Sequence, residues 1–473
     1  MEIKSLYIHT IGCQMNVYDA EKMAAGLQAL HYLPVASAAA ADLILLNTCA
    51  IREKAEQKVF SYLGRLAPLK SRNPRLIVAV GGCVAQQEGR RILERAPHVD
   101  LVFGTHAIGR LPALIGRIQR DRCRLVDVAM AEGFQETAFG TPQKHSGSVS
   151  RFVTSMQGCD NYCTYCVVPY VRGREASRQP EQIIAEIEAL VASGVREVTL
   201  LGQNVNSYGL KERLCSFAEL LARVDAVRGL ARIRFTTSHP KDLSQPLIQA
   251  FGRLPKLCNH IHLPVQSGAD RVLKKMNRRY TRADYLEKVH RLREVRPDIA
   301  ITSDFIAGFP GETAADFDQT LDLIRQVDFD GVFAFMYSDR PVAPAARFSD
   351  KVPEAEKKRR LQALLAAQDL NTTRKNQALI GTVQRILVDG ASRKLGEGPL
   401  DDSPHAPQWV GRTTTNKIVH FSTADVAPGF TPVEPGMLID VQIENAFAHS
   451  LKGRPLTCQA PCTGVKGENS HAA

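Results

Sequence analysis

Three cysteines within eight consecutive residues constrain this chain more than any other feature. Cys159, Cys163 and Cys166 have the spacing C-x3-C-x2-C and follow an apolar strand pattern at residues 151–156. Thiolates are soft ligands, and so dense a set in a loop suits an iron–sulfur cluster or zinc. A four-iron cluster commonly takes four cysteines, so three local ones leave one iron free for another ligand. The pattern favours a catalytic iron–sulfur loop over a structural zinc site or a chance grouping.

A second set of three cysteines is spread along residues 1–123, where the pattern predicts an α/β domain with a parallel sheet. If the strands are parallel, the three thiols emerge at one carboxyl edge, where open α/β sheets bind ligands. One cysteine after a strand is commonly a packed small side chain, but three equivalent ones predict a second cluster. The predicted strands and the cysteines that follow them are residues 6–10 with Cys13, 43–46 with Cys49, and 76–80 with Cys83.

The middle of the chain predicts an open, partial barrel of six βα units over residues 151–375, after a linker at 124–150. Barrel chemistry lies at the carboxyl ends of the strands. Polar side chains at those ends are candidates to bind an amino acid and a ribose; each alone is equally explained by loop capping. The predicted strands are residues 151–156, 197–201, 232–236, 260–264, 300–306 and 331–336, and the candidate contacts are Gln203, Asn204, Ser238, Gln266 and Asp304.

Residues 376–450 predict a small antiparallel β-barrel of the kind that holds looped nucleic acid, and 451–473 predict a disordered tail. Arg385, Arg412 and Lys417 would supply positive charge, and Trp409 is either a stacking surface or core. The run at 271–282 carries six basic residues, which contact phosphates or form a solvated helix face.

The composition indicates which cellular compartment and which partners to expect. The 60 Lys and Arg against 49 Asp and Glu give a formal net charge of +11, which favours a polyanionic partner such as nucleic acid. Eleven cysteines in 473 residues, at these spacings, indicate metal binding rather than disulfides. The sequence has no run of about 18 apolar residues that would predict a membrane span, and we expect a cytoplasmic protein. Nothing in the sequence demands more than a monomer.

Four stretches carry a resemblance to a known family. The loop GCDNYCTYC at 158–166 resembles the signature of the radical S-adenosylmethionine superfamily. Its continuation VVPYVRGREASR at 167–178 is similar to the methylthiotransferase branch, as are GCQMN at 12–16, NTCAIREKA at 47–55 and GGCVAQ at 81–86. The resemblance covers residues 1 to about 450. It departs from the family pattern at Val17, Ala20 and residues 340–346, none of which is a predicted cluster ligand.

The resemblance implies an N-terminal methylthiotransferase domain, a radical barrel and a C-terminal TRAM domain. It implies two [4Fe-4S] clusters, and S-adenosylmethionine bound to the open iron of the barrel cluster and cleaved there by one electron from a donor such as flavodoxin or ferredoxin. The implied reaction is methylthiolation at C2 of a prenylated adenosine beside the anticodon of tRNA. By resemblance, Cys159, Cys163 and Cys166 hold the radical cluster, and Cys13, Cys49 and Cys83 hold the auxiliary one.

Two kinds of alternative stay open. The same chemistry can act on a threonylcarbamoyl adenosine in tRNA or on an aspartate of a ribosomal protein; the motifs of the first 86 residues favour the prenylated base. A protein of another class, a non-catalytic iron–sulfur sensor that binds RNA, would bind without consuming S-adenosylmethionine.

Overall fold

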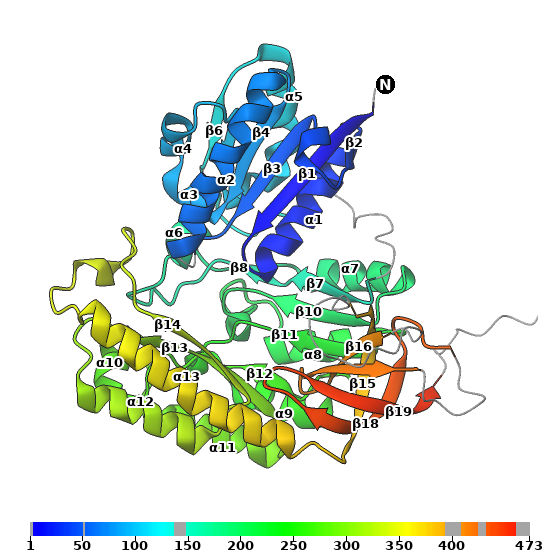
Figure 1. The fold of residues 1–473 in the computed structure, drawn as a ribbon, viewed down its shortest axis with the longest axis vertical. Helices are drawn as coiled ribbons and strands as arrows, with labels where there is room; N and C mark the ends of the chain where they lie inside the picture. Colours follow the sequence, from blue (N-terminus) through cyan, green and yellow to red (C-terminus); the bar gives the residue numbers. More distant parts are fainter. Residues whose placement is uncertain (1–2, 51–52, 137–147, 393–407, 424–431, 460–473) are drawn as a thin grey trace, which may run out of the picture.

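The computed structural model describes residues 3–50, 53–136, 148–392, 408–423 and 432–459, which form three domains (Figure 1). The first domain is a six-stranded parallel sheet in the order β2-β1-β3-β4-β5-β6. β3 and β4 are buried along their whole length because helices cover both faces. The strands are β1 (Lys4–Ile11), β2 (Tyr32–Pro34), β3 (Leu43–Thr48), β4 (Ile77–Gly82), β5 (Leu101–Phe103) and β6 (Leu125–Asp127).

Two hydrophobic clusters, one on each face, join this sheet to its helices. One face carries α1 (Gln14–Gln28) and α5 (Leu111–Asp121). The other face carries α2 (Glu53–Arg72), α3 (Cys83–Glu88) and α4 (Arg90–Arg95). The α/β domain predicted for the start of the chain is confirmed.

The second domain is the predicted open barrel of six parallel strands. They form two three-stranded sheets, β11-β10-β7 and β12-β13-β14, so β7 and β14 are open edges. A bridge between Ile233 and Leu257 continues the curve from one sheet toward the other. The strands are β7 (Ser150–Thr154), β10 (Glu197–Leu201), β11 (Arg232–Phe235), β12 (His260–His262), β13 (Ala300–Ala307) and β14 (Gly331–Met336). The helices are α7 (Pro180–Ala192), α8 (Phe217–Asp225), α9 (Gln245–Arg253), α10 (Asp270–Lys275), α11 (Arg282–Val295) and α12 (Ala314–Val327).

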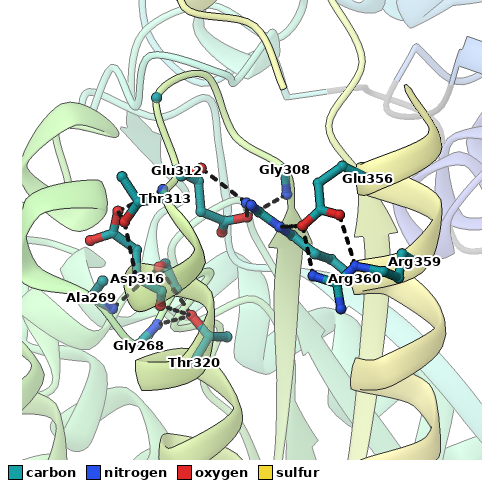
Figure 2. Close-up of polar contacts among 12 residues, drawn as sticks. Gly268, Ala269, Gly308, Glu312, Thr313, Asp316, Thr320, Glu356, Arg359 and Arg360 are labelled. Carbon is teal, nitrogen blue, oxygen red and sulfur yellow. Dashed lines mark hydrogen bonds and ion pairs between the residues drawn. The ribbon is translucent and has the colours of Figure 1, made fainter. Parts of the chain in front are cut away.

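Helix α13 (Glu354–Gln377) lies beside α12 and leads to the last domain (Figure 1). Figure 2 shows how its first turns are fixed to the turn before α12. The buried Arg360 guanidinium lies 2.7 Å from the Glu312 carboxylate, which also accepts a 2.8 Å hydrogen bond from the Gly308 amide. Thr313 caps α12 in a capping box with Asp316.

The third domain is a closed antiparallel-type barrel in the order β15-β16-β17-β19-β18, with one parallel pair between β17 and β19. Two arginines of β11 attach it to the open barrel: Arg232 Nη2 donates to the Arg385 carbonyl at 2.9 Å and Arg234 Nη2 to the Thr413 carbonyl at 2.7 Å. Its strands are β15 (Val383–Ala391), β16 (Gln408–Thr413), β17 (Ile418–Ser422), β18 (Leu438–Ala446) and β19 (Leu451–Gln459).

Two predicted boundaries are corrected. The linker expected from residue 124 begins later, because β6 (Leu125–Asp127) still pairs with β5. The disordered tail expected from residue 451 is wrong over its first nine residues, which form β19 between β17 and β18. Polar residues are tolerated there because an edge-free barrel satisfies the backbone on both sides. Residues 137–147 of the linker and 460–473 of the tail lie outside the described residues.

Among the helices of the described ranges, none has both the length and the apolar character needed to cross a bilayer.

Candidate active site

The three-cysteine loop lies between the two-residue strand β8 (Met156–Gln157) and the short helix α6 (Val168–Val171). Gly158 begins it at φ +74°, and a Cβ there would lie 2.0 Å from the Arg174 carbonyl oxygen, so only glycine fits. The Gly158 amide donates to Gln203 Oε1 at 2.6 Å, and Asn277 Nδ2 donates to the carbonyls of Asn161 and Tyr162 at 3.2 and 3.1 Å. Side chains from the barrel thus hold the loop in place.

The loop thiols receive N–H donors of the kind that stabilise metal-bound sulfur. The Val168 amide lies 3.5 Å from Cys166 Sγ, and Asn161 Nδ2 lies 3.5 Å from Cys159 Sγ. Burial raises the pKa of Cys159 to about 11 and of Cys166 to about 12, so these thiols ionise only when a cation binds them.

No three Cys, His, Asp or Glu side chains in the described ranges converge closely enough to hold a single metal ion. A four-iron cluster makes no such demand, because each of its cysteines binds a different iron.

Arg278 brings a buried positive charge to this loop. Arg278 is only 4% exposed. Its Nη1 lies 3.5 Å from Cys163 Sγ and 3.3 Å from the Tyr165 hydroxyl. Nε donates to the Tyr280 hydroxyl at 3.1 Å, and Nη2 donates to the Pro264 carbonyl. Among the described residues, no carboxylate forms an ion pair with it. Because a buried charge is costly unless an anion compensates it, the site fits an anionic thiolate-bound group.

The second cysteine set is assembled by the register of the first sheet. β1 pairs with β3 at Ile11–Thr48, and β3 pairs with β4 at Thr48–Gly82. The next residues are therefore Cys49 and Cys83 on adjacent strands, with Cys13 two residues beyond Ile11. The hydrogen bond between the Cys13 and Cys49 thiols lowers the pKa of Cys13 to about 6, whereas burial raises the pKa of Cys83.

Gly82 makes room for this arrangement. It has φ +92°, and a Cβ there would lie 2.3 Å from the Thr48 carbonyl oxygen. Asn16 closes the other side: its amide donates to Asn47 Oδ1 and to the Thr48 carbonyl, both at 3.0 Å. The strand ends are held together by polar contacts, as a ligand site at a sheet edge requires.

Arg172 connects the two cysteine sets, because it follows the loop in sequence but contacts the first domain. Its Nε donates to Cys83 Sγ at 3.3 Å and its Nη2 pairs with Asp19 at 2.7 Å, and the residue is 5% exposed. Around it, α1 is clamped to the barrel by a buried ion pair of Lys22 with Glu186 at 2.9 Å. Arg178 pairs with the same Glu186. These contacts fix the distance between the two sites.

A cavity of about 1010 Å³ runs from the first domain into the open barrel. Cys13 and Cys49 form one wall, and inward-facing side chains of the barrel strands form the others; the three loop thiols do not line it. Asp389, Arg412 and Asn416 of the last domain also line it. The barrel residues that line it include Phe152, Thr199, Thr236, His262, Thr302, Asp304, Phe333 and Phe335.

The five predicted S-adenosylmethionine contacts fall into different environments. Asp304 lines the cavity 3.5 Å from His262 Nε2. The Ser238 hydroxyl is buried and has no hydrogen-bond partner among the described residues, so it can still bind a ligand. Gln203 instead holds the cysteine loop, and Asn204 is tied to Ser207 and Asp242 at 2.9 and 2.7 Å. Gln266 is buried at φ +78°, and its backbone bonds to Asp304 and Ile306. All five remain predictions.

The predicted nucleic-acid contacts differ in exposure: Arg385 is exposed, whereas Arg412 and Lys417 are partly buried. Lys417 is 13% exposed and lies 3.9 Å from Asp330, and Arg412 lies 3.5 Å from Asp389. The Arg385 carbonyl accepts from Arg232. Trp409 packs against the barrel core, as the second of its two interpretations expects.

In the basic run at 271–282, several side chains pair with carboxylates, and Arg278 turns inward. The sequence did not single out Arg278 or Arg172 as residues that contact the thiols. The local sequence pattern does not reveal either contact, because Arg278 lies 115 positions from Cys163 and Arg172 lies 89 positions from Cys83.

The comparisons with known proteins agree with these sites. Residues 5–104 match the model of "Uncharacterized protein family UPF0004", and residues 153–324 match that of the radical SAM superfamily. A Desulfosudis oleivorans protein named tRNA-2-methylthio-N(6)-dimethylallyladenosine synthase is 54% identical, covering 100% of each chain. Proteins of that name from Geobacter metallireducens and Syntrophus aciditrophicus are 50% and 48% identical over 95% and 96% of this chain and 98% and 95% of theirs.

Among solved structures, the radical S-adenosylmethionine methyltransferase TsrM from Kitasatospora setae, with tryptophan and an S-adenosylmethionine analogue bound, aligns with a TM-score of 0.55. The alignment covers 84% of this chain and 79% of that one at 13% identity, so it supports the fold alone.

The open six-stranded barrel with three cysteines in the loop after its first strand defines a radical S-adenosylmethionine protein. Such a protein carries a [4Fe-4S] cluster and S-adenosylmethionine. The identity of 48–54% with these relatives along nearly the whole chain defines the family within that superfamily. The chain belongs to the tRNA-2-methylthio-N(6)-dimethylallyladenosine synthase family.

Proposed function

We propose that this protein is a tRNA methylthiotransferase that replaces the hydrogen at C2 of N(6)-dimethylallyladenosine, next to the anticodon, by a methylthio group. The observation that carries this proposal is the cavity that joins the thiols of Cys13 and Cys49 to the inner face of the barrel. A base in a loop of RNA is accessible to such a cavity without the opening of a long duplex.

Cys159, Cys163 and Cys166 are the ligands we assign to the radical [4Fe-4S] cluster. When bound, that cluster with S-adenosylmethionine supplies the one-electron cleavage that makes abstraction of an aromatic hydrogen possible. The protein's own side chains position the cysteine loop. Gln203 and Asn277 hydrogen-bond to its backbone, and the buried, charged Arg278 donates to the Cys163 thiol. Ser238 and Asp304 are the contacts we favour for S-adenosylmethionine, because the buried Ser238 hydroxyl has no partner among the described residues and Asp304 lines the cavity.

Cys13, Cys49 and Cys83 are the ligands we assign to a second [4Fe-4S] cluster, which would supply sulfur. Their support is the common sheet edge, the N–H donor from Arg172 to Cys83, and the contact between the Cys13 and Cys49 thiols that favours ionisation. A second S-adenosylmethionine would provide the methyl group, and a low-potential carrier such as flavodoxin or ferredoxin would provide electrons.

The test is methylthiolation of defined RNA by anaerobically reconstituted protein. An anticodon stem-loop with the dimethylallyl adenosine, supplied with S-adenosylmethionine and a reductant, is digested to nucleosides for mass spectrometry. We expect the methylthio derivative of the prenylated base. Modification of a threonylcarbamoyl adenosine instead, or RNA binding without cleavage of S-adenosylmethionine, would refute the proposal and support one of the two alternatives.

A further inference from the structure

The edge strand β14 (Gly331–Met336) places its large side chains on the side that the fold leaves open. Val332 and Ala334 pack against the hydrophobic core of the barrel. Phe333 and Phe335 alternate with them, point the other way and line the cavity. Phe333 is 55% exposed, although an edge strand with an exposed aromatic side chain is a risk for aggregation. Folding does not explain this side chain, whereas an apolar ligand does.

Phe333 lies beside one polar pair and shares the cavity wall with other aromatic side chains. The His262 ring meets the Phe333 ring edge to face at 5.9 Å between centroids, and His262 Nε2 lies 3.5 Å from Asp304. Burial lowers the pKa of the neighbouring His260 to about 3, so its imidazole is neutral and adds no charge to the cavity. Phe152 and Phe235 line the same space. Charged side chains also line the cavity, among them Glu197, Arg234 and Arg412, so the four phenylalanines are its main apolar part, and that part suits a small apolar group.

We propose that Phe333, supported by Phe335, binds the dimethylallyl group of the substrate base and so determines selectivity for the prenylated adenosine; this rests on the proposed function. The cavity has Cys13 and Cys49 on one wall and Phe333 on another. In adenine, C2 and C6 flank N1, so a base that turns C2 toward the sulfur site presents its N6 substituent sideways. The five-carbon branched substituent is the one apolar feature that distinguishes this base from adenosine.

The inference is tested by binding rather than by turnover. Fluorescence anisotropy on the full-length reconstituted protein, without S-adenosylmethionine or reductant, compares stem-loops that differ only in the dimethylallyl group. Phe333→Ala should lower the preference for the prenylated RNA by about tenfold or more while the affinity for the unmodified RNA stays the same. Phe333→Leu should keep part of the preference. Val332→Ala, on the opposite face of the same strand, is the control and should keep all of it.

An unchanged preference in a folded Phe333→Ala variant, with its thermal unfolding midpoint equal to that of the wild type, overturns the inference. If Phe333→Ala does not fold, the Phe333→Leu variant decides: a preference equal to that of the wild type refutes the role. Whatever the Phe333 variants show, the proposed function stands if the wild-type protein methylthiolates the prenylated stem-loop. Wild-type protein that neither prefers nor modifies that RNA refutes the proposed function itself.

Discussion

The two cysteine sites differ in how the chain builds them. Cys159, Cys163 and Cys166 are close in sequence, so any fold that forms the loop brings them near one another. Cys13, Cys49 and Cys83 meet only because β1, β3 and β4 are adjacent, parallel and paired in one register. A slip of one residue would turn a strand's side chains to the opposite face. One site depends on local spacing and the other on the packing of a whole domain.

The two sites also balance charge differently. Each has a buried arginine that donates to a thiol: Arg278 to Cys163 at 3.5 Å and Arg172 to Cys83 at 3.3 Å. Arg172 is paired with Asp19 at 2.7 Å, whereas the described partners of Arg278 are neutral oxygens and the thiol. The loop site therefore keeps an uncompensated positive charge for an anionic occupant, and the sheet-edge site supplies its own counter-charge.

The largest expected effect is the loss of a different product when one cysteine of each site is replaced. Cys163→Ala should abolish formation of 5′-deoxyadenosine, whereas Cys49→Ala should retain it and lose the methylthiolated product. Each variant should fall from about eight to about four irons per chain, since each loses one four-iron cluster. Chromatography of the adenosine products and iron analysis measure both. Full methylthiolated product from Cys49→Ala would refute the division of labour.

The next effect tests the difference between the two arginines. Arg278→Met should lower the rate of S-adenosylmethionine cleavage about 10–100-fold, as loss of an outer-shell donor does, and should alter the electron paramagnetic resonance of the loop cluster. Arg172→Met should leave that cleavage unchanged and reduce methylthiolation. Arg278→Lys, which keeps the charge, serves as the matched control. Equal effects of the two methionine variants on cleavage would contradict the charge argument.

A smaller effect concerns the clamp that fixes the two sites relative to each other. Glu186→Gln leaves Lys22 and Arg178 without their carboxylate, and the side chains of the Lys22–Glu186 pair are only 8% and 7% exposed. We expect a loss of about 3–5 kcal/mol in the stability of the interface. Glu181→Gln, which breaks an exposed pair with Arg223, should cost less than about 1 kcal/mol. Urea unfolding followed by fluorescence measures both; similar midpoints would refute the role of the clamp.

The smallest effect is the pH dependence of that clamp. Burial alone would raise the pKa of Glu186, but the charges of Lys22 and Arg178 outweigh it and hold the pKa below the ordinary 4.5. A depressed pKa stabilises the folded state above the unfolded value, and this contribution is lost as the pH falls through the folded pKa. The stability difference between wild type and Glu186→Gln should therefore be constant near neutrality and shrink below pH 4.5. A difference that grows in acid would contradict this.

Much of the framework followed from the sequence. The predicted bounds of strands 197–201 and 331–336 equal those observed, because each is a short, mostly apolar run with a glycine at one end. Short or polar elements were missed: β5 and β6 are three residues each, and β19 is interrupted by charges and Pro455. Such strands exist because neighbouring strands pair with them, and pairing partners are not visible in a local pattern.

The sequence by itself determined the chemistry of the cysteine loop and the order of the three domains, since both depend on neighbours along the chain. Tertiary structure alone decided which side chains serve the thiols. Arg278 reaches Cys163 over 115 positions and Arg172 reaches Cys83 over 89. It also decided that Phe333 faces a cavity while Val332 faces the core. The physical reason is that a buried charge or an open aromatic wall is defined by what packs around it, and those neighbours come from distant parts of the chain.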